Sequence, residues 1–134
     1  MRIGSSVAYL DSSALLKIAV DEAENDALRS ALPAWSRRAS SRLSAVEVLR
    51  AARRRSPAAV EPARRVLAGL SLISVDRRVL AHAVDLEPAV LRTLDAIHLA
   101  SALRLGRALA AFVSYDERQL EAARELGLTA ASPR

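Results

Sequence analysis

The sequence of 134 residues contains no cysteine and very few aromatic side chains. Without cysteine the chain can form neither disulfides nor thiolate metal sites, which suits a reducing cytoplasm. Aromatic residues make up 3% of the chain, too few for a platform on which the bases of single-stranded nucleic acid would stack. No uncharged stretch reaches the length of a membrane span, and Asp11 interrupts the apolar run at Val7 too early for a signal peptide. We therefore expect a cytoplasmic protein with no membrane partner.

Hydrophobic residues make up 51% of the chain, and most of them are alanine, leucine and valine. This content excludes an intrinsically disordered chain and predicts an aliphatic core built largely from helices. The length fits one domain, so we expect residues 1–134 to form a single domain. The net charge is +5, and Lys17 is the only lysine. A basic chain is compatible with a polyanionic partner, although charge alone does not identify one.

Apolar runs and stretches of helical periodicity alternate along the chain, and glycine or proline separates many of them. The predicted strands are Val7–Leu10, Ala39–Leu43, Leu70–Val75, Ala111–Tyr115 and Leu128–Ala131. The predicted helices are Ser12–Val20, Glu22–Leu32, Ser44–Arg55, Pro62–Ala68, Arg77–Leu86, Asp95–Leu105 and Glu117–Leu126. Gly69, Gly106 and Gly127 each follow a helix, so a left-handed backbone is expected at all three. Strands separated by helices imply right-handed crossovers, so the sequence predicts an α/β fold with a parallel sheet.

Four acidic residues fall where predicted strands end or predicted helices begin. Asp11 and Asp116 each follow an apolar strand, whereas Glu47 and Asp95 lie in the first turn of their helices. Because the carboxyl ends of parallel strands meet at one edge of a sheet, we expect the four side chains to converge in one crevice. Carboxylates this close raise each other's pKa values unless a cation lies between them. Hard oxygen ligands favour Mg²⁺ or Mn²⁺, which would activate water and neutralise the charge of a phosphodiester.

Each of these acids also has an ordinary structural interpretation. Asp11 could cap the helix that follows it, and Asp95 could complement a helix dipole. The segments Ser44–Glu47 and Asp116–Gln119 both match capping boxes. For any single residue the structural interpretation is at least as good as the functional one, but four such acids in one α/β domain favour a shared metal site.

The segments around the four acids resemble the motifs of the PIN-domain family, particularly those of VapC-type toxins. The segments are Tyr9–Lys17, Ser44–Ala51, Leu94–Ala100 and Phe112–Ala123. They occur in the family's order and span nearly the whole chain. The resemblance implies a PIN-like fold, in which a central, mostly parallel sheet of four to five strands is flanked by helices on both faces.

The resemblance also implies a function and its residues. A VapC-type chain would be the toxin of a type II toxin–antitoxin system, an endoribonuclease that needs Mg²⁺ or Mn²⁺ and cleaves cellular RNA. Asp11, Glu47, Asp95 and Asp116 match the family's catalytic and metal-binding quartet, and Ser12 and Ser114 match positions that support the site. The family further implies a cognate VapB-type antitoxin and a homodimeric toxin.

Other polar residues carry weaker signals. Lys17 and Arg53 are candidate contacts to RNA phosphates. A solvated helix face explains Lys17 equally well. Arg53 lies at the end of the helix that carries Glu47, where the helix dipole already favours a positive charge, so an RNA contact there is the weaker hypothesis. His98 lies about one helical turn after Asp95, and we expect it to pack or hydrogen-bond near the site rather than bind metal. His82 has no acidic cluster nearby in the sequence and is expected at the surface.

Two further functions remain open at this point. One is a catalytically silent RNA-binding regulator with the PIN fold, which the intact acidic quartet disfavours. The other is a receiver-like phosphoacceptor module, which would need an adjacent acidic pair near the first strand, whereas Asp11 is followed by Ser12 and Ser13. A phosphatase of the haloacid dehalogenase type would need a second aspartate at the position of Ser13.

Overall fold

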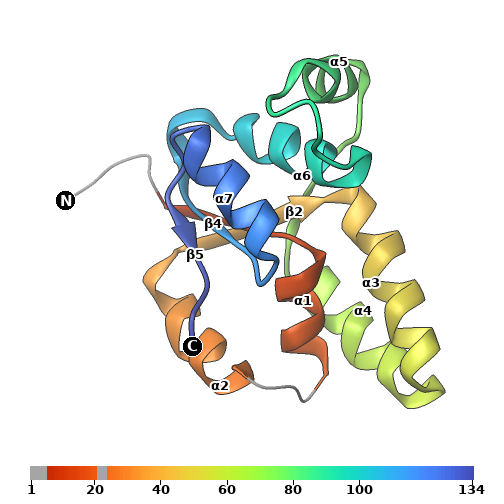
Figure 1. The fold of residues 1–134 in the computed structure, drawn as a ribbon. Helices are drawn as coiled ribbons and strands as arrows, with labels where there is room; N and C mark the ends of the chain where they lie inside the picture. The colour runs from red at the N-terminus through yellow and green to blue at the C-terminus, as the bar shows by residue number, and fades with distance from the viewer. Residues whose placement is uncertain (1–5, 21–23) are drawn as a thin grey trace.

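The computed structural model describes residues 6–20 and 24–134, and it has an α/β architecture (Figure 1). Five strands of the described residues form one parallel sheet in the order β3–β2–β1–β4–β5. The strands are β1 (Val7–Leu10), β2 (Arg37–Ser41), β3 (Ser71–Ile73), β4 (Leu109–Val113) and β5 (Ala130–Ala131). The predicted parallel sheet of four to five strands is therefore confirmed, with β1 at its centre.

Seven α-helices occur within the described ranges. They are α1 (Ser12–Ala19), α2 (Asn25–Ala31), α3 (Arg42–Arg55), α4 (Val60–Ala68), α5 (Arg77–Asp85), α6 (Thr93–Leu103) and α7 (Glu117–Glu125). The first residues of the predicted helix Glu22–Leu32 lie outside the described residues, and most of the remainder forms α2. No helix in residues 6–20 and 24–134 has the length and apolar character needed to cross a membrane.

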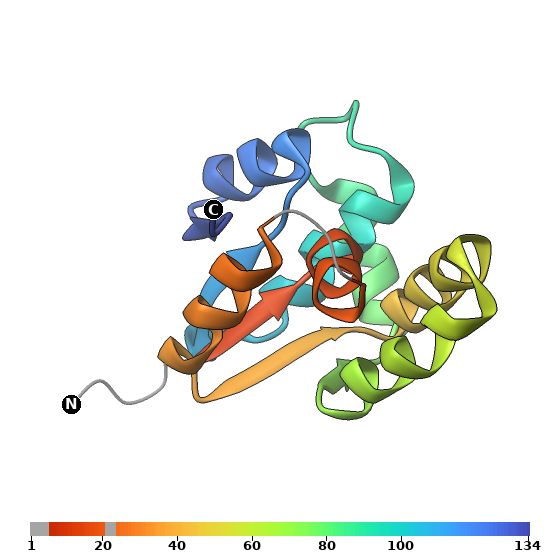
Figure 2. The same ribbon diagram turned by 90° about the horizontal axis from the view of Figure 1, so that it is seen from below.

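Helices cover both faces of the sheet, and the side chains of β1 alternate between the two layers (Figure 1; Figure 2). Ala8 and Leu10 belong to one core cluster, together with residues of α1, α2, α3 and α4. Tyr9 belongs to the opposite cluster with residues of α5, α6 and α7, and its ring stacks on Phe112 with 5.3 Å between ring centroids. A strand covered on both faces is apolar throughout, which explains the fully buried run Val7–Leu10.

Strand β2 starts two residues earlier than the predicted strand Ala39–Leu43 and ends at Ser41. The cause is a helix cap, since Oγ of Ser41 accepts a hydrogen bond from the backbone N–H of Leu43 at 3.1 Å. Helix α3 therefore begins two residues before Ser44, and the capping role predicted for Ser44 is wrong. As a result Glu47 lies in the second turn of α3, not in the first turn as predicted.

The three helix-ending glycines differ in backbone conformation. Gly106 and Gly127 have φ values of +55° and +81°, which confirms the predicted left-handed backbone at these two positions. Gly69 has a φ of −85°, so the prediction for it is wrong. Helix α4 ends there with backbone hydrogen bonds from Gly69 to carbonyl groups of its own last turn, which needs no left-handed residue.

Candidate active site

Asp11 is the first residue beyond β1, at the carboxyl edge of the central strand, and its side chain is buried. The carboxylate caps α1, because Oδ1 accepts a hydrogen bond from the backbone N–H of Ala14 at 3.1 Å. The same oxygen accepts a hydrogen bond from Oγ of Ser13 at 2.6 Å, and Oδ2 accepts one from Oγ of Ser114 at 2.5 Å. The predicted cap and the predicted site residue are therefore the same carboxylate, held in one orientation by both of its oxygens.

The electrostatic state of Asp11 follows from this burial. Loss of solvent around the carboxylate raises the pKa of Asp11 above its ordinary value. Hydrogen bonds from Ser114 and Ser13, the charge interaction with His98 and the N–H of Ala14 each lower that pKa, but they do not cancel the effect of burial. The ionised form of Asp11 is thus less favourable in the folded chain than in water, and a positive charge beside it would favour that form.

Two serines connect the ends of β1 and β4 around this carboxylate. Ser114 follows β4, and its Oγ also accepts a hydrogen bond from the backbone N–H of Asp116 at 3.0 Å. Ser13 accepts one from the backbone N–H of Tyr115 at 2.9 Å. The supporting position predicted for Ser114 fits this geometry, whereas the contact to Asp11 comes from Ser13 and not from the predicted Ser12. From the sequence Asp11-Ser12-Ser13, either serine could have contacted Asp11. The course of α1 places Ser13, and not Ser12, against the carboxylate.

Asp116 and Asp95 approach the site from the start of two helices. Asp116 caps α7, since Oδ1 accepts hydrogen bonds from the backbone N–H groups of Arg118 and Gln119 at 3.0 and 3.4 Å. Asp95 lies in the first turn of α6, as predicted, and is half-buried, but no side chain of the described residues caps this helix. The cap that the sequence suggested for α7 is therefore present together with the candidate site role of Asp116.

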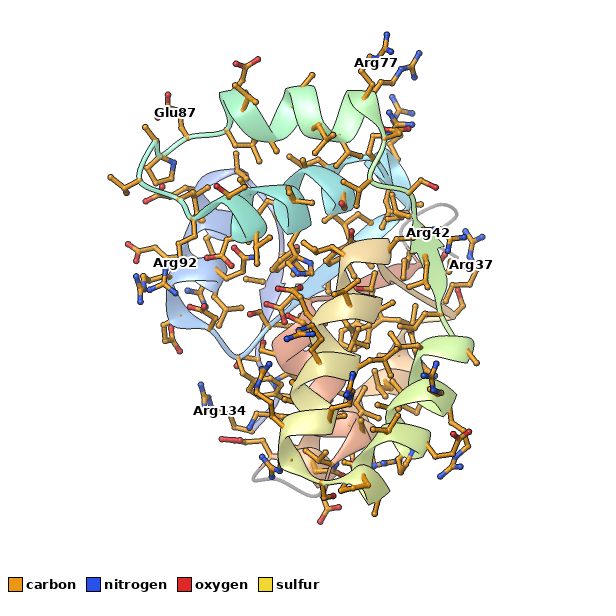
Figure 3. The ribbon with its side chains drawn as sticks, turned by 90° about the vertical axis from the view of Figure 1, so that its right-hand side faces the viewer. Arg37, Arg42, Arg77, Glu87, Arg92 and Arg134 are labelled. Carbon is orange, nitrogen blue, oxygen red and sulfur yellow. The ribbon has the colours of Figure 1, made fainter. Side chains whose placement is uncertain are left out.

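Charge interactions link Asp95 to the other two aspartates. Burial raises the pKa of Asp95, and the negative charges of Asp116 and Asp11 raise it further. The charges of His98 and Arg92 oppose this rise, and Arg92 lies just before α6 (Figure 3). The aspartates that follow β1 and β4 thus both act on the carboxylate at the start of α6.

Glu47 forms a hydrogen bond with a histidine that lies close to the aspartates. Its Oε1 lies 2.6 Å from Nε2 of His98, one turn beyond Asp95 on α6, and the imidazole is almost fully buried. Nδ1 of His98 lies 2.7 Å from the hydroxyl of Tyr9, which is itself fully buried in β1. The expectation that His98 hydrogen-bonds near the site is confirmed, and so is the exposed position of His82. Sequence reasoning did not anticipate the role of Tyr9, because no local pattern links it to α6.

Comparison with known proteins agrees with this geometry. The PIN domain family matches residues 8–125. Ribonuclease VapC46 of Mycobacterium tuberculosis is 50% identical over 93% of this chain and 96% of its own length. Ribonuclease VapC47 of the same species is 44% identical with the same coverage of both chains. This chain is a VapC-type member of the PIN-domain family. The resemblance seen in the sequence motifs is thereby confirmed.

A solved structure supports the fold of this PIN domain. A chain described as a toxin-antitoxin complex from Klebsiella pneumoniae superimposes with a TM-score of 0.67. The superposition covers 84% of this chain and 89% of the other, and the sequences are 23% identical. At this level of identity the match confirms the layered α/β fold and carries no information about the site.

The four carboxylates of the PIN domain are ligands of the chemical type that a hard divalent cation prefers. Carboxylate oxygens are the ligands that Mg²⁺ and Mn²⁺ prefer, and a cation would relieve the repulsion that raises the pKa of Asp95. In the part of the chain that the structure describes, no three His, Asp or Glu side chains are grouped closely enough to hold a metal ion. Glu47 is paired with His98 instead. Binding a cation would therefore require the carboxylates to draw together.

A cavity of about 470 Å³ adjoins Glu47 between α1 and α3. Its polar lining includes Ser12, Ser13, Arg50 and Arg54, and its apolar lining comes from side chains such as Leu16, Leu43, Val46 and Leu94. Arg50, Arg53 and Arg54 line a second hollow of about 250 Å³ beside it. Helix α3 therefore presents arginine guanidinium groups on the same surface as one member of the acidic quartet.

The basic residues singled out from the sequence differ in their surroundings. Lys17 forms an ion pair with Glu24, with 3.0 Å between Nζ and Oε2, and its Nζ lies 4.8 Å from the ring centroid of Tyr115. Arg53 is exposed on the last turn of α3. Lys17 is thus already engaged by neighbouring side chains, whereas Arg53 faces solvent beside the arginine-lined hollow.

Proposed function

We propose that this chain is the toxin of a type II toxin–antitoxin system, a Mg²⁺- or Mn²⁺-dependent endoribonuclease that cleaves cellular RNA in the cytoplasm. The observation that carries the proposal is the placement of Asp11 directly after β1, Asp116 at the start of the helix that follows β4 and Asp95 in the first turn of α6. Asp11 and Asp95 both have raised pKa values, which is expected where a cation is meant to bind. The relatives from Mycobacterium tuberculosis are named as ribonucleases, which supports the same activity.

Asp11, Glu47, Asp95 and Asp116 would hold the ion. When bound, a divalent cation supplies an activated water for in-line attack on the phosphodiester and stabilises the departing oxygen. The chain supplies orientation, since Ser13 and Ser114 fix both oxygens of Asp11. Backbone N–H groups of α7 fix Asp116 in the same way. These hydrogen bonds hold two acceptors in place before the ion and the substrate arrive.

Arginines of α3 would bind the RNA backbone next to the acidic site. Arg50 and Arg54 line the cavity that Glu47 also lines, so a strand that reaches the acids passes these guanidinium groups. Arginine binds phosphate through several fixed donors, which suits this task. We keep Arg53 as a further contact on the neighbouring hollow. Lys17 remains a candidate that would first have to leave Glu24.

We also propose a cognate VapB-type antitoxin that inhibits the toxin and a homodimeric assembly of the toxin. In support of a partner, five large apolar side chains are exposed in the described residues: Val46, Leu80, Val84, Val90 and Leu94. Val46 and Leu94 line the cavity next to Glu47, whereas Leu80 and Val84 line a separate hollow. Exposed apolar side chains gathered in a hollow are often covered by another chain in a complex. Analytical ultracentrifugation of the purified chain should give twice the monomer mass of 14.4 kDa, and a monomer at micromolar concentration would contradict the homodimer.

Incubation of total RNA with the purified protein and Mg²⁺ tests the nuclease directly. We expect cleavage of the RNA that EDTA abolishes. Asp116→Asn should reduce the cleavage rate by about 100-fold or more, because the amide removes a charged metal ligand while keeping the helix cap. Asp76→Asn is the matched control, because Asp76 caps α5 through Val79 in the same manner but is fully exposed beside Arg104. Intact RNA with the native protein would favour the catalytically silent RNA-binding regulator instead.

A further inference from the structure

A buried polar chain links the core of the sheet to the acidic site. The hydroxyl of Tyr9 lies 2.7 Å from Nδ1 of His98, and Nε2 of the same ring lies 2.6 Å from Oε1 of Glu47. Tyr9 is fully buried, His98 is 2% exposed, and the three residues come from β1, α6 and α3. Both ring nitrogens of one buried histidine are thus engaged, each by a different element of the fold.

The chemistry of these groups assigns the proton between His98 and Glu47. An ionised carboxylate can only accept hydrogen bonds, so the short contact to Glu47 requires a proton on Nε2. A tyrosine hydroxyl can donate or accept, so it can pair with Nδ1 whether or not that nitrogen carries a proton. The imidazole is therefore held at both ring nitrogens, with its Nε2–H directed at Glu47.

The surroundings of Tyr9 keep its hydroxyl protonated. Burial raises the pKa of the Tyr9 hydroxyl well above its ordinary value, and the negative charge of Asp11 adds to this effect. The ring is held in place independently of the hydroxyl, because it stacks on Phe112 with an interplanar angle of 8°. A phenylalanine at position 9 would preserve this packing and remove the hydroxyl, together with its interactions with His98, Ser40 and Ser101.

We propose that Tyr9 and His98 are positioning residues for Glu47: the hydroxyl of Tyr9 holds the imidazole of His98 in place, and the Nε2–H of His98 holds one oxygen of the Glu47 carboxylate at the acidic site. The inference rests on the proposed function, in which Glu47 binds the cation. The charge interactions of His98 with Asp11 and Asp95 place the imidazole beside the remaining acids. Hydrogen-bonded partners of metal ligands typically contribute about 10–100-fold to metal affinity or activity.

The protonation of His98 can be read directly in the metal-free protein. Nitrogen-15 NMR of protein labelled at histidine separates the two neutral tautomers from the imidazolium, and exposed His82 serves as an internal reference. We expect a proton on Nε2 of His98 in the native protein and a changed His98 spectrum in Tyr9→Phe. An Nε2 without a proton, or an unchanged His98 spectrum in Tyr9→Phe, would overturn the proposal.

Cation binding and turnover supply the second readout. By calorimetry, Mn²⁺ affinity should fall about tenfold in Tyr9→Phe and up to about 100-fold in His98→Leu. The turnover number should follow, with KM for RNA unchanged. His98→Gln should recover part of the loss because its amide can donate to Glu47, and His82→Gln should behave as the native protein. Equal Mn²⁺ affinity in all these variants would refute the role.

These measurements separate this inference from the proposed function. If the native protein cleaves no RNA, the nuclease proposal fails, while the protonation of His98 and the Mn²⁺ titrations still decide the roles of Tyr9 and His98. Thermal unfolding of each variant checks the fold. Tyr9→Phe should unfold cooperatively because its ring packing is kept, at a lower Tm than the native protein because buried polar groups lose the hydroxyl.

Discussion

Oγ of Ser114 lies 2.5 Å from Oδ2 of Asp11, and this contact joins two residues that are 103 positions apart in the sequence. Asp11 follows β1 and Ser114 follows β4, the neighbouring strand of the sheet. Parallel pairing of β1 with β4 is what brings the two side chains to the same edge. The hydroxyl also partly offsets the cost of burying the carboxylate, so the contact links the sheet topology to the acidity of the site.

Ser114→Ala should shift the acidic limb of the pH–rate profile to higher pH. The Ser114 hydrogen bond lowers the pKa of Asp11 against the effect of burial, so removing it should raise that pKa further. A hydrogen bond to a charged group contributes about 1.5–3 kcal/mol, so the acidic limb should move measurably to higher pH. The pH–rate profile of RNA cleavage measures this. Ser36→Ala, an exposed serine bonded to the Ser6 carbonyl, is the control and should leave the profile unchanged.

Asp11→Asn should stabilise the metal-free protein at neutral pH while abolishing cleavage. The folded pKa of Asp11 is raised, so its contribution to stability is present below its ordinary pKa and is lost as the pH rises through the folded value. The amide remains neutral and keeps the helix cap. Each unit of pKa shift corresponds to about 1.4 kcal/mol.

Urea unfolding in EDTA, repeated across the acidic and neutral range, measures the effect of Asp11→Asn. The gain over the native protein should be greatest at neutral pH and should shrink toward the ordinary pKa of aspartate, near about pH 4. A variant less stable than the native protein at neutral pH would show that the carboxylate stabilises the fold in its ionised form.

Replacing Arg50 and Arg54 together with glutamine should weaken RNA binding. Both side chains line the cavity next to Glu47, where they can neutralise RNA phosphates. Each phosphate that is no longer neutralised should reduce the log–log salt slope of single-strand binding by about 0.7. Fluorescence anisotropy of a labelled RNA in EDTA measures binding without cleavage. The control is the pair Arg64→Gln and Arg65→Gln on α4, which removes the same charge from exposed positions. Equally weakened binding in both variants would indicate only a general charge effect.

Gly127→Ala and Gly69→Ala should differ in stability although each adds the same methyl group. Gly127 has a φ of +81°, where an alanine is strained by about 1–2 kcal/mol, and nothing lies within 4 Å of the added carbon. Gly69 has a φ of −85°, and an added carbon would meet the carbonyl oxygen of Val66 at 3.6 Å, an ordinary van der Waals distance. Thermal unfolding should show a lower Tm for Gly127→Ala alone. A comparable destabilisation at both positions would point to a cause other than the backbone.

The sequence by itself determined the element types and the main acids. The alternation of apolar runs with stretches of helical periodicity placed the ends of the strands to within about two residues. Strands that are buried on both faces are apolar throughout, so the sequence alone reveals them. Asp11 and Asp116 could be found because a polar residue directly after such a run must lie at the sheet edge. The ends of β2 and α3 were less accurate, since a single hydrogen bond from Leu43 to Ser41 decides them.

Only the tertiary structure decided which polar residues meet. Asp76 caps the helix after β3 much as Asp116 caps the helix after β4, yet β3 is at the edge of the sheet and Asp76 lies beside Arg104 at the far end of α6. Likewise, the contacts of His98 with Tyr9 and Glu47 span 89 and 51 residues. The reason is physical: periodicity reports which side of an element is buried, whereas strand order and helix packing set which side chains face each other across the site.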